Sequence, residues 1–365
     1  MTDQEYMLRA IQLAKKGEGW TNPNPMVGAV IVKDGKIIGE GYHKKYGELH
    51  AERNAIASLT ESAEGAVIYV TLEPCCHHGK TPPCTEAIIE QKIRKVVIGS
   101  RDPNPKVAGK GVQILRDHGV EVETGLLEEE CLSLNEIFFH YITTKMPYVA
   151  MKYAMTLDGK IASFSGDSKW VTGEKAREHT HFLRKKYRGI LVGIGTVLAD
   201  DPMLNCRIEN GVDPVRIVCD SHLQIPLECQ LVKTAKNIET IVCYAEENEE
   251  KQKALMEAGV QLIKAEKDGQ VDLEKLMMEL GSMEIDSVLV EGGGAIHGSF
   301  LTSGLVQKVY CYIAPKMIGG KDALSPVLGK GIEKMSDAVE ITDVTVQNFG
   351  SDICVSGHMK QKKEG

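Results

Sequence analysis

The chain has 365 residues, which is enough for about two domains. Hydrophobic residues make up 42% and charged residues 26% of it, a composition typical of globular proteins that excludes a disordered or fibrous chain. Its formal net charge of −8 argues against a protein that grips nucleic acid through phosphates, although a local basic patch remains compatible with it. No apolar run reaches the roughly 18 residues of a membrane span, and residues 1–10 lack the pattern of a signal peptide, so we expect a cytoplasmic protein.

Residues 1–145 are expected to form the first domain. Met7, Ala10, Ile11 and Ala14 recur at helical spacing, and Asp34-Gly35 marks a hairpin turn. The predicted elements are a helix over 3–16, strands over 27–32 and 36–41, a helix over 51–59, a strand over 67–71, a helix ending at 91, a strand over 96–99, a helix over 112–118, a strand over 120–123 and one closing helix over 126–141. Their alternation predicts a three-layer α/β fold.

Pro147 marks the start of a second domain, over residues 146–365. Strands are predicted over 148–154, 189–193, 215–220, 240–244, 288–290 and 308–314, with helices near 174–187, 249–258, 271–280 and 295–303. This alternation predicts a second α/β domain.

A candidate zinc site lies in the first domain. His50 opens a predicted helix, and Cys75 and Cys84 follow downstream. One imidazole and two thiolates leave a fourth tetrahedral position for water, whose pKa the metal would lower toward neutrality. Both cysteines are expected near helix starts, where the helix dipole favours thiolate. Glu52 stands two residues after His50, close enough to shuttle a proton to a leaving amine.

Zinc nucleobase deaminases carry His-x-Glu followed by Pro-Cys-x-x-Cys. The chain matches at His50-Ala-Glu52 and Pro74-Cys75, but eight residues separate Cys75 from Cys84. Cys76 is too close to Cys75 for the usual gap, so Cys84 is assigned as the second thiolate. The alternative is a structural zinc site or a set of buried thiols. Glu52 and Pro74, together with the strand before the cysteines, favour a hydrolytic zinc.

Two glycine-rich segments resemble parts of dinucleotide-binding motifs. Gly193-Ile-Gly195 lacks the third glycine of the Rossmann fingerprint and is not interpreted as one. Gly292, Gly293 and Gly294 follow an apolar strand and open a helix, where backbone N–H groups can approach a phosphate. The alternative is a tight turn that binds nothing.

These motifs resemble one family, the bifunctional riboflavin-biosynthesis deaminase–reductases, in which a long spacer between the two cysteines is characteristic. The resemblance covers nearly the whole chain and keeps the family's order of motifs. It rests on the segments 22–28, 73–84 and 102–111 in the first domain, and on 157–162, 168–172, 196–204, 290–294 and 314–316 in the second.

The resemblance implies a cytidine-deaminase-like domain with one Zn²⁺, followed by a dihydrofolate-reductase-like domain that uses NADPH. The first would hydrolyse the 2-amino group of 2,5-diamino-6-(5-phosphoribosylamino)pyrimidin-4-one. The second would reduce the ribosyl group of the deaminated product to ribityl. A small phosphorylated substrate, no nucleic-acid or membrane partner and a homo-oligomer are expected.

In the first domain, the resemblance and the substrate's chemistry suggest further residues. Asn24 would hold the polar edge of the pyrimidine, although a turn residue before Pro25 is an alternative. Lys80 would bind the phosphate, with a solvated loop charge as the alternative. Other substrate contacts are expected from His43, His77, Asp102 and Asn104, the last two of which also suit a rigid turn.

In the second domain, the resemblance places Ala154, Trp170, Thr196 and Asp200 at NADPH. It places Ser168, Arg184, Leu204 and Arg207 at the substrate, with the arginines on its phosphate. Lys152, Asp200 and Glu291 are candidate proton donors or orienting groups, and the sequence does not rank them; Glu291 is also a candidate substrate contact. His179, His181 and His297 are expected to cap or pack.

The alternative function is a nucleic-acid or free-nucleotide zinc deaminase with an accessory nucleotide-binding domain. A deaminase that edits RNA or DNA would need a basic surface and stacking aromatics, but aromatic residues are only 5% and the net charge is acidic. A scaffold with a structural zinc would have no use for Glu52 as a proton shuttle.

Overall fold

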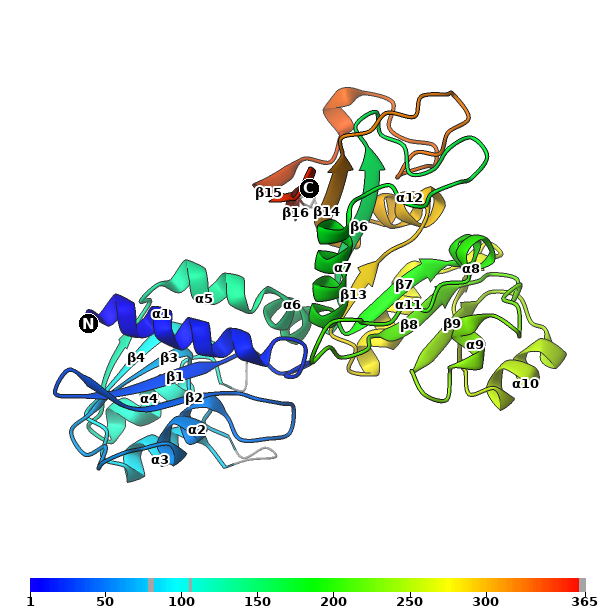
Figure 1. Ribbon diagram of the computed structural model, residues 1–365. Helices are drawn as coiled ribbons and strands as arrows, with labels where there is room; N and C mark the ends of the chain where they lie inside the picture. Colours follow the sequence, from blue (N-terminus) through cyan, green and yellow to red (C-terminus); the bar gives the residue numbers. More distant parts are fainter. Residues whose placement is uncertain (78–81, 105–106, 361–365) are drawn as a thin grey trace. The chain divides into compact units, whose positions relative to one another are not determined.

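The computed structural model describes residues 1–77, 82–104 and 107–360. The chain divides into two compact units, Met1–Lys145 and Met146–Gly365 (Figure 1). Within the described ranges, no helix combines the length and the apolar character needed to cross a bilayer.

The first unit is built on a five-stranded sheet in the order β2-β1-β3-β4-β5. β1 pairs antiparallel with β2 and β3, whereas β3, β4 and β5 run parallel. The elements are α1 (Asp3–Ala14), η1 (Lys15–Gly17), β1 (Gly28–Lys33), β2 (Lys36–Tyr42), α2 (Ala51–Ala57), β3 (Val67–Leu72), α3 (Cys84–Glu90), β4 (Lys95–Ser100), α4 (Lys110–Asp117), β5 (Glu121–Thr124), α5 (Glu128–Leu134) and α6 (Glu136–Thr144).

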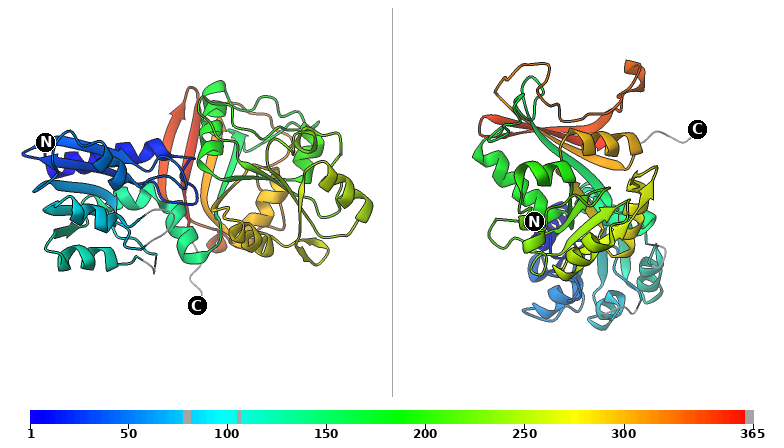
Figure 2. Two further views of the ribbon diagram at one scale, coloured as in Figure 1. Left: turned by 90° about the horizontal axis from the view of Figure 1, so that it is seen from below. Right: turned by 90° about the vertical axis from the view of Figure 1, so that its right-hand side faces the viewer.

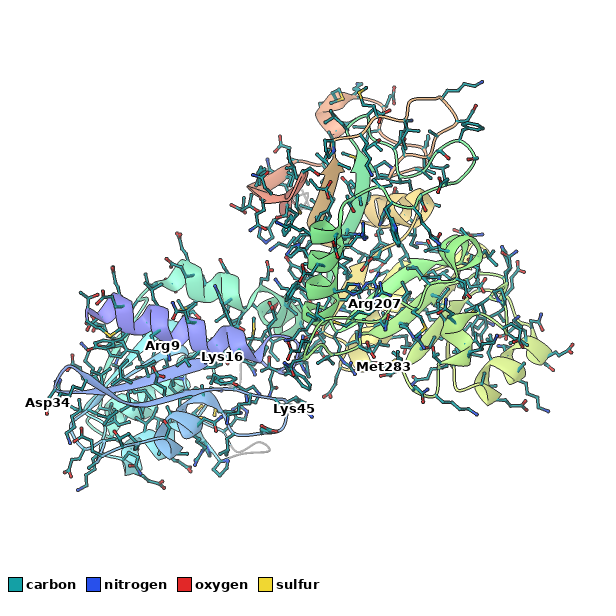
Figure 3. All side chains as sticks on the ribbon, in the orientation of Figure 1. Arg9, Lys16, Asp34, Lys45, Arg207 and Met283 are labelled. Carbon is teal, nitrogen blue, oxygen red and sulfur yellow. The ribbon has the colours of Figure 1, made fainter. Side chains whose placement is uncertain are left out.

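Alternating side chains give this sheet two buried faces. Ala29 and Ile31 of β1 join a core with α2, α3 and α4, whereas Val30 and Val32 face α1 and α5. Figure 1 shows these two sets of helices on opposite faces of the sheet. On α1, Arg9 also pairs with Glu40 of β2, 2.7 Å from Nε to Oε1 (Figure 3). The predicted three-layer α/β domain is confirmed.

The second unit contains a nine-stranded sheet in the order β10-β9-β8-β7-β13-β6-β14-β16-β15. The strands from β10 to β14 in this order run parallel, and the β15–β16 hairpin adds antiparallel strands at one edge (Figure 2). The elements are β6 (Tyr148–Thr156), α7 (Glu174–Lys186), β7 (Gly189–Gly193), α8 (Ile194–Asp200), β8 (Val215–Cys219), α9 (Gln230–Lys233), β9 (Thr240–Tyr244), α10 (Glu249–Glu257), β10 (Gln261–Lys264), β11 (Glu266–Lys267), β12 (Gln270–Val271), α11 (Leu273–Ser282), β13 (Ser287–Val290), α12 (Gly294–Ser303), β14 (Val306–Ala314), η2 (Met335–Asp337), β15 (Ile341–Phe349) and β16 (Asp352–Met359).

Helices cover both faces of this sheet. Leu276 of α11 and Phe300 of α12 join one core, whereas Val197 of α8, Leu231 of α9 and Leu255 of α10 join the other. Because the parallel strands end at the same edge, the segments after β7 and β13 come together there, which is where ligands bind in sheets of this kind. The predicted α/β fold is confirmed, although the strands β10, β11 and β12, the helices α8 and α9 and the terminal β15–β16 hairpin were not predicted.

The prediction of one closing helix over 126–141 is wrong. The segment forms α5 and α6, separated at Asn135, whose φ of −118° is not helical. The buried Asn135 side chain accepts a hydrogen bond from Met26 N (2.8 Å) and donates one to Met26 O (2.9 Å). The helix is interrupted where this amide satisfies both backbone groups of Met26.

We predict that Asn135→Ala destabilises the first unit by about 1–3 kcal/mol, because it leaves the Met26 N–H and C=O without their partner. Urea unfolding of the full chain, followed through the transition of the first unit, measures the change. The neighbouring exposed Ser133→Ala is the matched control and is expected to stay within about 0.5 kcal/mol of wild type. Equal stability of both variants would contradict the role assigned to Asn135.

Candidate active sites

The three predicted zinc ligands lie together in the first unit. His50 precedes α2 as its N-cap, Cys75 lies in the loop after β3, and Cys84 is the first residue of α3. His50 Nδ1 is 3.4 Å from Cys75 Sγ and 3.5 Å from Cys84 Sγ. Their ligand atoms all lie within 4.8 Å of one another, and among the described residues these three form the group able to hold a metal ion.

These separations fit one tetrahedral ion. Zn–N bonds of about 2.0 Å and Zn–S bonds of about 2.3 Å, at a tetrahedral angle, place nitrogen and sulfur about 3.5 Å apart. The distances from His50 to the two sulfurs match this value. Three protein ligands are one fewer than a closed tetrahedral zinc site has, and catalytic zinc sites have this number.

Backbone contacts fix the two cysteines. The carbonyl oxygen of Cys75 accepts hydrogen bonds from the N–H groups of Cys84 (3.1 Å) and Thr85 (3.2 Å). Arg53, one turn into α2, donates to the carbonyl oxygens of Pro82 (3.0 Å) and Pro83 (2.8 Å). These bonds hold the start of α3 beside the start of α2.

Cys75 corrects one expectation. It does not lie at the start of a helix of its own, because the loop after β3 continues past it. Its sulfur nevertheless accepts a hydrogen bond from the N–H of Cys84 at the start of α3 (3.4 Å). The hydrogen bond from the Cys84 thiol, together with His50, lowers the pKa of the Cys75 thiol below its usual range. Thiolate is the form that binds zinc.

Glu52 lies in the first turn of α2, two residues after His50, and is only 3% exposed. Burial raises the pKa of its carboxyl above the usual range, and the side chain hydrogen-bonds the Cys84 thiol. A buried carboxyl in contact with a ligand sulfur lies where a proton shuttle is needed.

Asn24 and His43 meet beside these ligands. His43 Nδ1 lies 3.1 Å from Leu49 O, and its Nε2 lies 3.4 Å from Asn24 Nδ2. Burial lowers the pKa of His43, which favours a neutral ring that donates to Leu49 and accepts from Asn24. The rings of His43 and His50 lie edge to face, 5.5 Å apart. Asn24 also takes part in a turn through its N–H to Thr21 O.

The segment that carries Asp102 and Asn104 is an ordered turn. Asp102 Oδ1 accepts a hydrogen bond from Asn104 N (2.8 Å), and burial raises the pKa of Asp102 to about 6. Glu73, which was not predicted as a site residue, is buried between this segment and the metal loop. His77 is exposed, and Lys80 lies outside the described residues.

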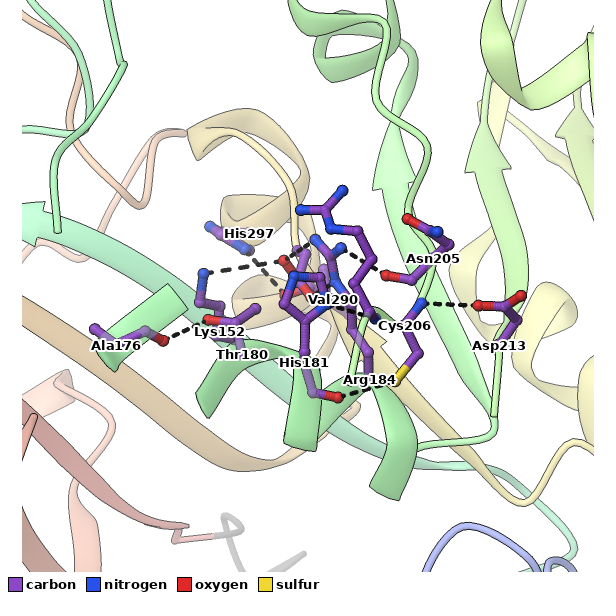
Figure 4. A network of polar contacts seen from close by, with 12 residues as sticks. Lys152, Ala176, Thr180, His181, Arg184, Asn205, Cys206, Asp213, Val290 and His297 are labelled. Carbon is purple, nitrogen blue, oxygen red and sulfur yellow. Dashed lines mark hydrogen bonds and ion pairs between the residues drawn. The ribbon is translucent and has the colours of Figure 1, made fainter. Parts of the chain in front are cut away.

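A partly buried cluster of charges forms the second site. Glu291, directly after β13, receives a bidentate pair from Arg184 of α7, with Nε–Oε1 of 2.9 Å and Nη2–Oε2 of 3.0 Å. Lys152 Nζ on β6 lies 3.9 Å from Glu291 Oε2 (Figure 4). Asp200, the third candidate for proton transfer, is instead exposed at the end of α8.

The segment 204–207 is tied to this cluster. Arg184 Nη1 donates to Asn205 O (3.1 Å), and Arg207 N donates to His181 Nδ1 (3.2 Å). Cys206 N donates to Asp213 Oδ1 (2.8 Å), as Figure 4 shows. The Arg207 side chain is exposed, whereas the buried Leu204 has a positive φ of 51°.

Asn205 was missed by the sequence analysis. Its Oδ1 is the buried side-chain polar atom for which the structure shows no hydrogen-bond partner among the described residues. Such atoms are normally satisfied by water or a ligand. No pattern in the sequence distinguishes Asn205 from an ordinary loop amide.

The three glycines after Glu291 differ in the space that a side chain would have at each position. A Cβ at Gly292 would lie 2.1 Å from Ile296 Cγ2, and one at Gly294 would lie 2.6 Å from Leu328 Cγ and Ser325 O. A Cβ at Gly293, the N-cap of α12, would meet nothing within 4 Å. Packing therefore explains two of the glycines, and Gly293 has open space for a ligand.

The remaining predicted residues lie around the carboxyl ends of the strands. Ala154 is on β6, Thr196 is partly buried on α8, and Ser168 is partly buried in the loop between β6 and α7. Trp170 in the same loop is 62% exposed, with Arg177 4.7 Å above its ring. His297 is fully buried and packs near Gly292, as expected.

Comparison with known proteins covers both units. Residues 1–100 match the model of the cytidine and deoxycytidylate deaminase zinc-binding region, and residues 147–355 match the RibD C-terminal domain. Riboflavin biosynthesis protein RibD of Actinobacillus pleuropneumoniae is 55% identical over 97% of this chain and 94% of its own. That of Aquifex aeolicus is 44% identical over 97% of each chain.

Solved structures agree. The Thermotoga maritima diaminohydroxyphosphoribosylaminopyrimidine deaminase/5-amino-6-(5-phosphoribosylamino)uracil reductase matches with a TM-score of 0.87, at 43% identity over 98% of both chains. Acinetobacter baumannii RibD, form 1, matches with a TM-score of 0.89 at 39% identity, over 98% of this chain and 99% of its own. These matches favour the bifunctional enzyme over a nucleic-acid or free-nucleotide deaminase. The chain belongs to the RibD family of riboflavin biosynthesis proteins, with a deaminase domain followed by a reductase domain.

Proposed function

We propose that residues 1–145 hydrolyse the 2-amino group of 2,5-diamino-6-(5-phosphoribosylamino)pyrimidin-4-one, and that residues 146–365 then reduce the ribosyl group of 5-amino-6-(5-phosphoribosylamino)uracil with NADPH. The observation that carries the first step is the set of His50, Cys75 and Cys84, with Glu52 buried beside it. The activities named for the Thermotoga maritima relative support both steps.

In deamination, His50, Cys75 and Cys84 would hold Zn²⁺, which when bound lowers the pKa of water and so supplies the nucleophile. Glu52 would accept a proton as water adds to the carbon that bears the amino group. It would return that proton to the nitrogen, which leaves as ammonia. Asn24, held by His43, would orient the pyrimidine, with Asp102 and Asn104 on the ribose. Lys80 and His77 remain proposed contacts toward the phosphate.

In reduction, NADPH would supply a hydride to the opened sugar. Lys152 would deliver the accompanying proton, because burial lowers the pKa of its ammonium and so makes it a better acid. Glu291 would orient Lys152 and contact the substrate. Asp200 lies at the exposed end of α8 and is proposed as an NADPH contact rather than the proton donor.

The NADPH site would include Gly293, because its backbone is open at the start of α12. Gly292 and Gly294 would shape the same turn. Ala154, Trp170 and Thr196 are proposed to line the cofactor, and Ser168 and Leu204 the substrate. For the phosphate, the exposed Arg207 is the stronger candidate, since Arg184 directs its bidentate face at Glu291.

Two neighbouring cations keep the carboxyl group of Glu291 ionised. Burial alone would raise the pKa of this carboxyl, but the nearby cations Arg184 and Lys152 lower it to about 2. A carboxylate with a lowered pKa stabilises the fold above its unfolded pKa, and this contribution is lost as pH falls through the folded value.

We further propose that the enzyme is a cytoplasmic homo-oligomer that acts on small phosphorylated molecules and has no nucleic-acid or membrane partner. The ten cysteines, which all lie within the described residues, form no disulfide, which is typical of a reducing compartment. The net charge of −8 supports the absence of a nucleic-acid partner.

We predict that Glu52→Gln retains zinc and loses deamination by about 100-fold or more, because the amide cannot accept and return the proton. Ammonia release from the diaminopyrimidine substrate, with zinc content measured on the same sample, provides the test. The exposed Glu61→Gln is the control and should release ammonia at the wild-type rate. Substantial ammonia release by Glu52→Gln would rule out Glu52 as the proton shuttle.

We predict that the two units work separately. Residues 1–145 alone should release ammonia without oxidising NADPH, and residues 146–365 alone should oxidise NADPH only when the deaminated substrate is supplied. Each half-reaction is assayed by itself on each purified fragment. If neither fragment is active while the full chain is, the units share a site or fold as one.

We predict that Glu291→Gln destabilises the second unit by roughly 3 kcal/mol at pH 7, the free energy that corresponds to a shift from 4.5 to about 2. The destabilisation should fall by more than half at pH 3, because that pH lies below the unfolded pKa of 4.5, where the carboxyl of the unfolded chain is mostly protonated, and within about one unit of the folded value. Urea unfolding at pH 7, 5 and 3 measures this. Glu239→Gln, which breaks an exposed pair with Arg188, is the control and should change little. A destabilisation by Glu291→Gln that is the same at every pH would contradict the assignment of Glu291 as an ionised carboxylate with a lowered pKa.

A further inference from the structure

The N-terminus of α4, the helix that follows the Asp102–Asn104 segment, is capped by a side chain from a distant part of the sequence. α4 begins at Lys110, and its N-cap is Gly109, with a φ of 78° and no side chain to accept hydrogen bonds from the first turn. Glu73 takes that role, because Oε2 accepts from Gly109 N (3.1 Å) and Oε1 accepts from Val112 N (3.2 Å). A carboxylate in this position also meets the positive end of the helix dipole.

Glu73 is itself fixed close to the metal ligands. It is 3% exposed, lies between β3 and Pro74-Cys75, and donates its own N–H to Ser100 O at the end of β4 (3.0 Å). α4 packs directly on this turn, because a Cβ at Gly111 would lie 2.3 Å from Pro74 O. One side chain therefore joins the loop that carries Cys75 to the start of α4.

The position of the Asp102–Asn104 segment follows from that junction. Asn104 O accepts hydrogen bonds from Val107 N (2.8 Å) and Ala108 N (2.9 Å), and Asn104 N is held by Asp102 Oδ1. Val107 and Ala108, which donate to Asn104 O, directly precede Gly109, whose N–H donates to Glu73 Oε2. A shift of the N-terminus of α4 would therefore move the side chains of Asp102 and Asn104 relative to the metal ligand Cys75.

We propose that Glu73 is a positioning residue for deamination, which sets the distance between the substrate-binding turn at Asp102–Asn104 and the metal ligand Cys75. Glu73 touches no substrate in this role and acts through the backbone of α4. The inference rests on the proposed deaminase function of the first unit.

The test is Glu73→Gln in the full chain, which keeps the size of the side chain but leaves one accepting oxygen and turns an amide N–H toward a backbone N–H. We expect the KM of the diaminopyrimidine substrate to rise about tenfold, as for the loss of one charge-assisted hydrogen bond, with a smaller change in kcat. Zinc content should stay at the wild-type level. NADPH oxidation with supplied deaminated substrate should be unchanged and serves as an internal control.

Two further variants make the result decisive. The exposed Glu64→Gln in the same unit should leave every parameter unchanged, and Glu73→Asp, which keeps the charge on a shorter chain, should give an intermediate KM and remains informative if Glu73→Gln fails to fold. A wild-type KM in folded Glu73→Gln or Glu73→Asp, with only a lower melting temperature, would overturn the proposal. If the wild-type chain itself releases no ammonia, the proposed function fails instead.

Discussion

Three ligand atoms from two separate segments of the first unit converge within bonding distance of a single ion. His50 comes from the start of α2, and Cys75 and Cys84 come from the other segment, in the turn after β3 and at the start of α3. Their convergence depends on a folded α/β sheet, because β3 delivers the cysteine loop and Arg53 joins it to α2. Glu52 lies in the first turn of the same helix, two residues after His50. It is buried there and hydrogen-bonds the Cys84 thiol, which is the position that a proton shuttle requires.

The second unit depends on a different constraint, the burial of charge. Parallel strands bring Lys152 and Glu291 to one edge of the sheet, and α7 adds Arg184. The Glu291 carboxylate is tolerated here because two cations lie beside it and Arg184 donates two hydrogen bonds to it, and removing one partner would leave an uncompensated charge. The same arrangement holds the segment 204–207 in place and leaves Asn205 Oδ1 for a ligand or water to satisfy.

Periodicity and motif spacing predicted both α/β folds and the zinc ligand set, because these depend on local patterns. Asn135 was hidden inside a continuous helical pattern, and only its contact with Met26, more than a hundred positions away, explains the break. Glu73 was missed for the same reason, since its partners are the distant backbone N–H groups of Gly109 and Val112. Asn205 was missed because no sequence pattern indicates that its Oδ1 is buried without a partner. The glycines after Glu291 suggested phosphate binding as a set, whereas packing against Ile296 and Leu328 accounts for two of them. The β15–β16 hairpin was missed because β15 is largely exposed and lacks a strong apolar pattern.

We propose that the deaminase domain holds one zinc ion through one imidazole and two thiolates, with a position left for water. Metal analysis combined with zinc X-ray absorption spectroscopy on the purified full chain tests it most directly, on wild type and on Cys76→Ser. We expect one zinc per chain, a first shell of two sulfurs and two lighter atoms, and the same spectrum for both proteins. A third sulfur that disappears in Cys76→Ser, or a chain that binds no zinc when the metal is supplied, would contradict the account.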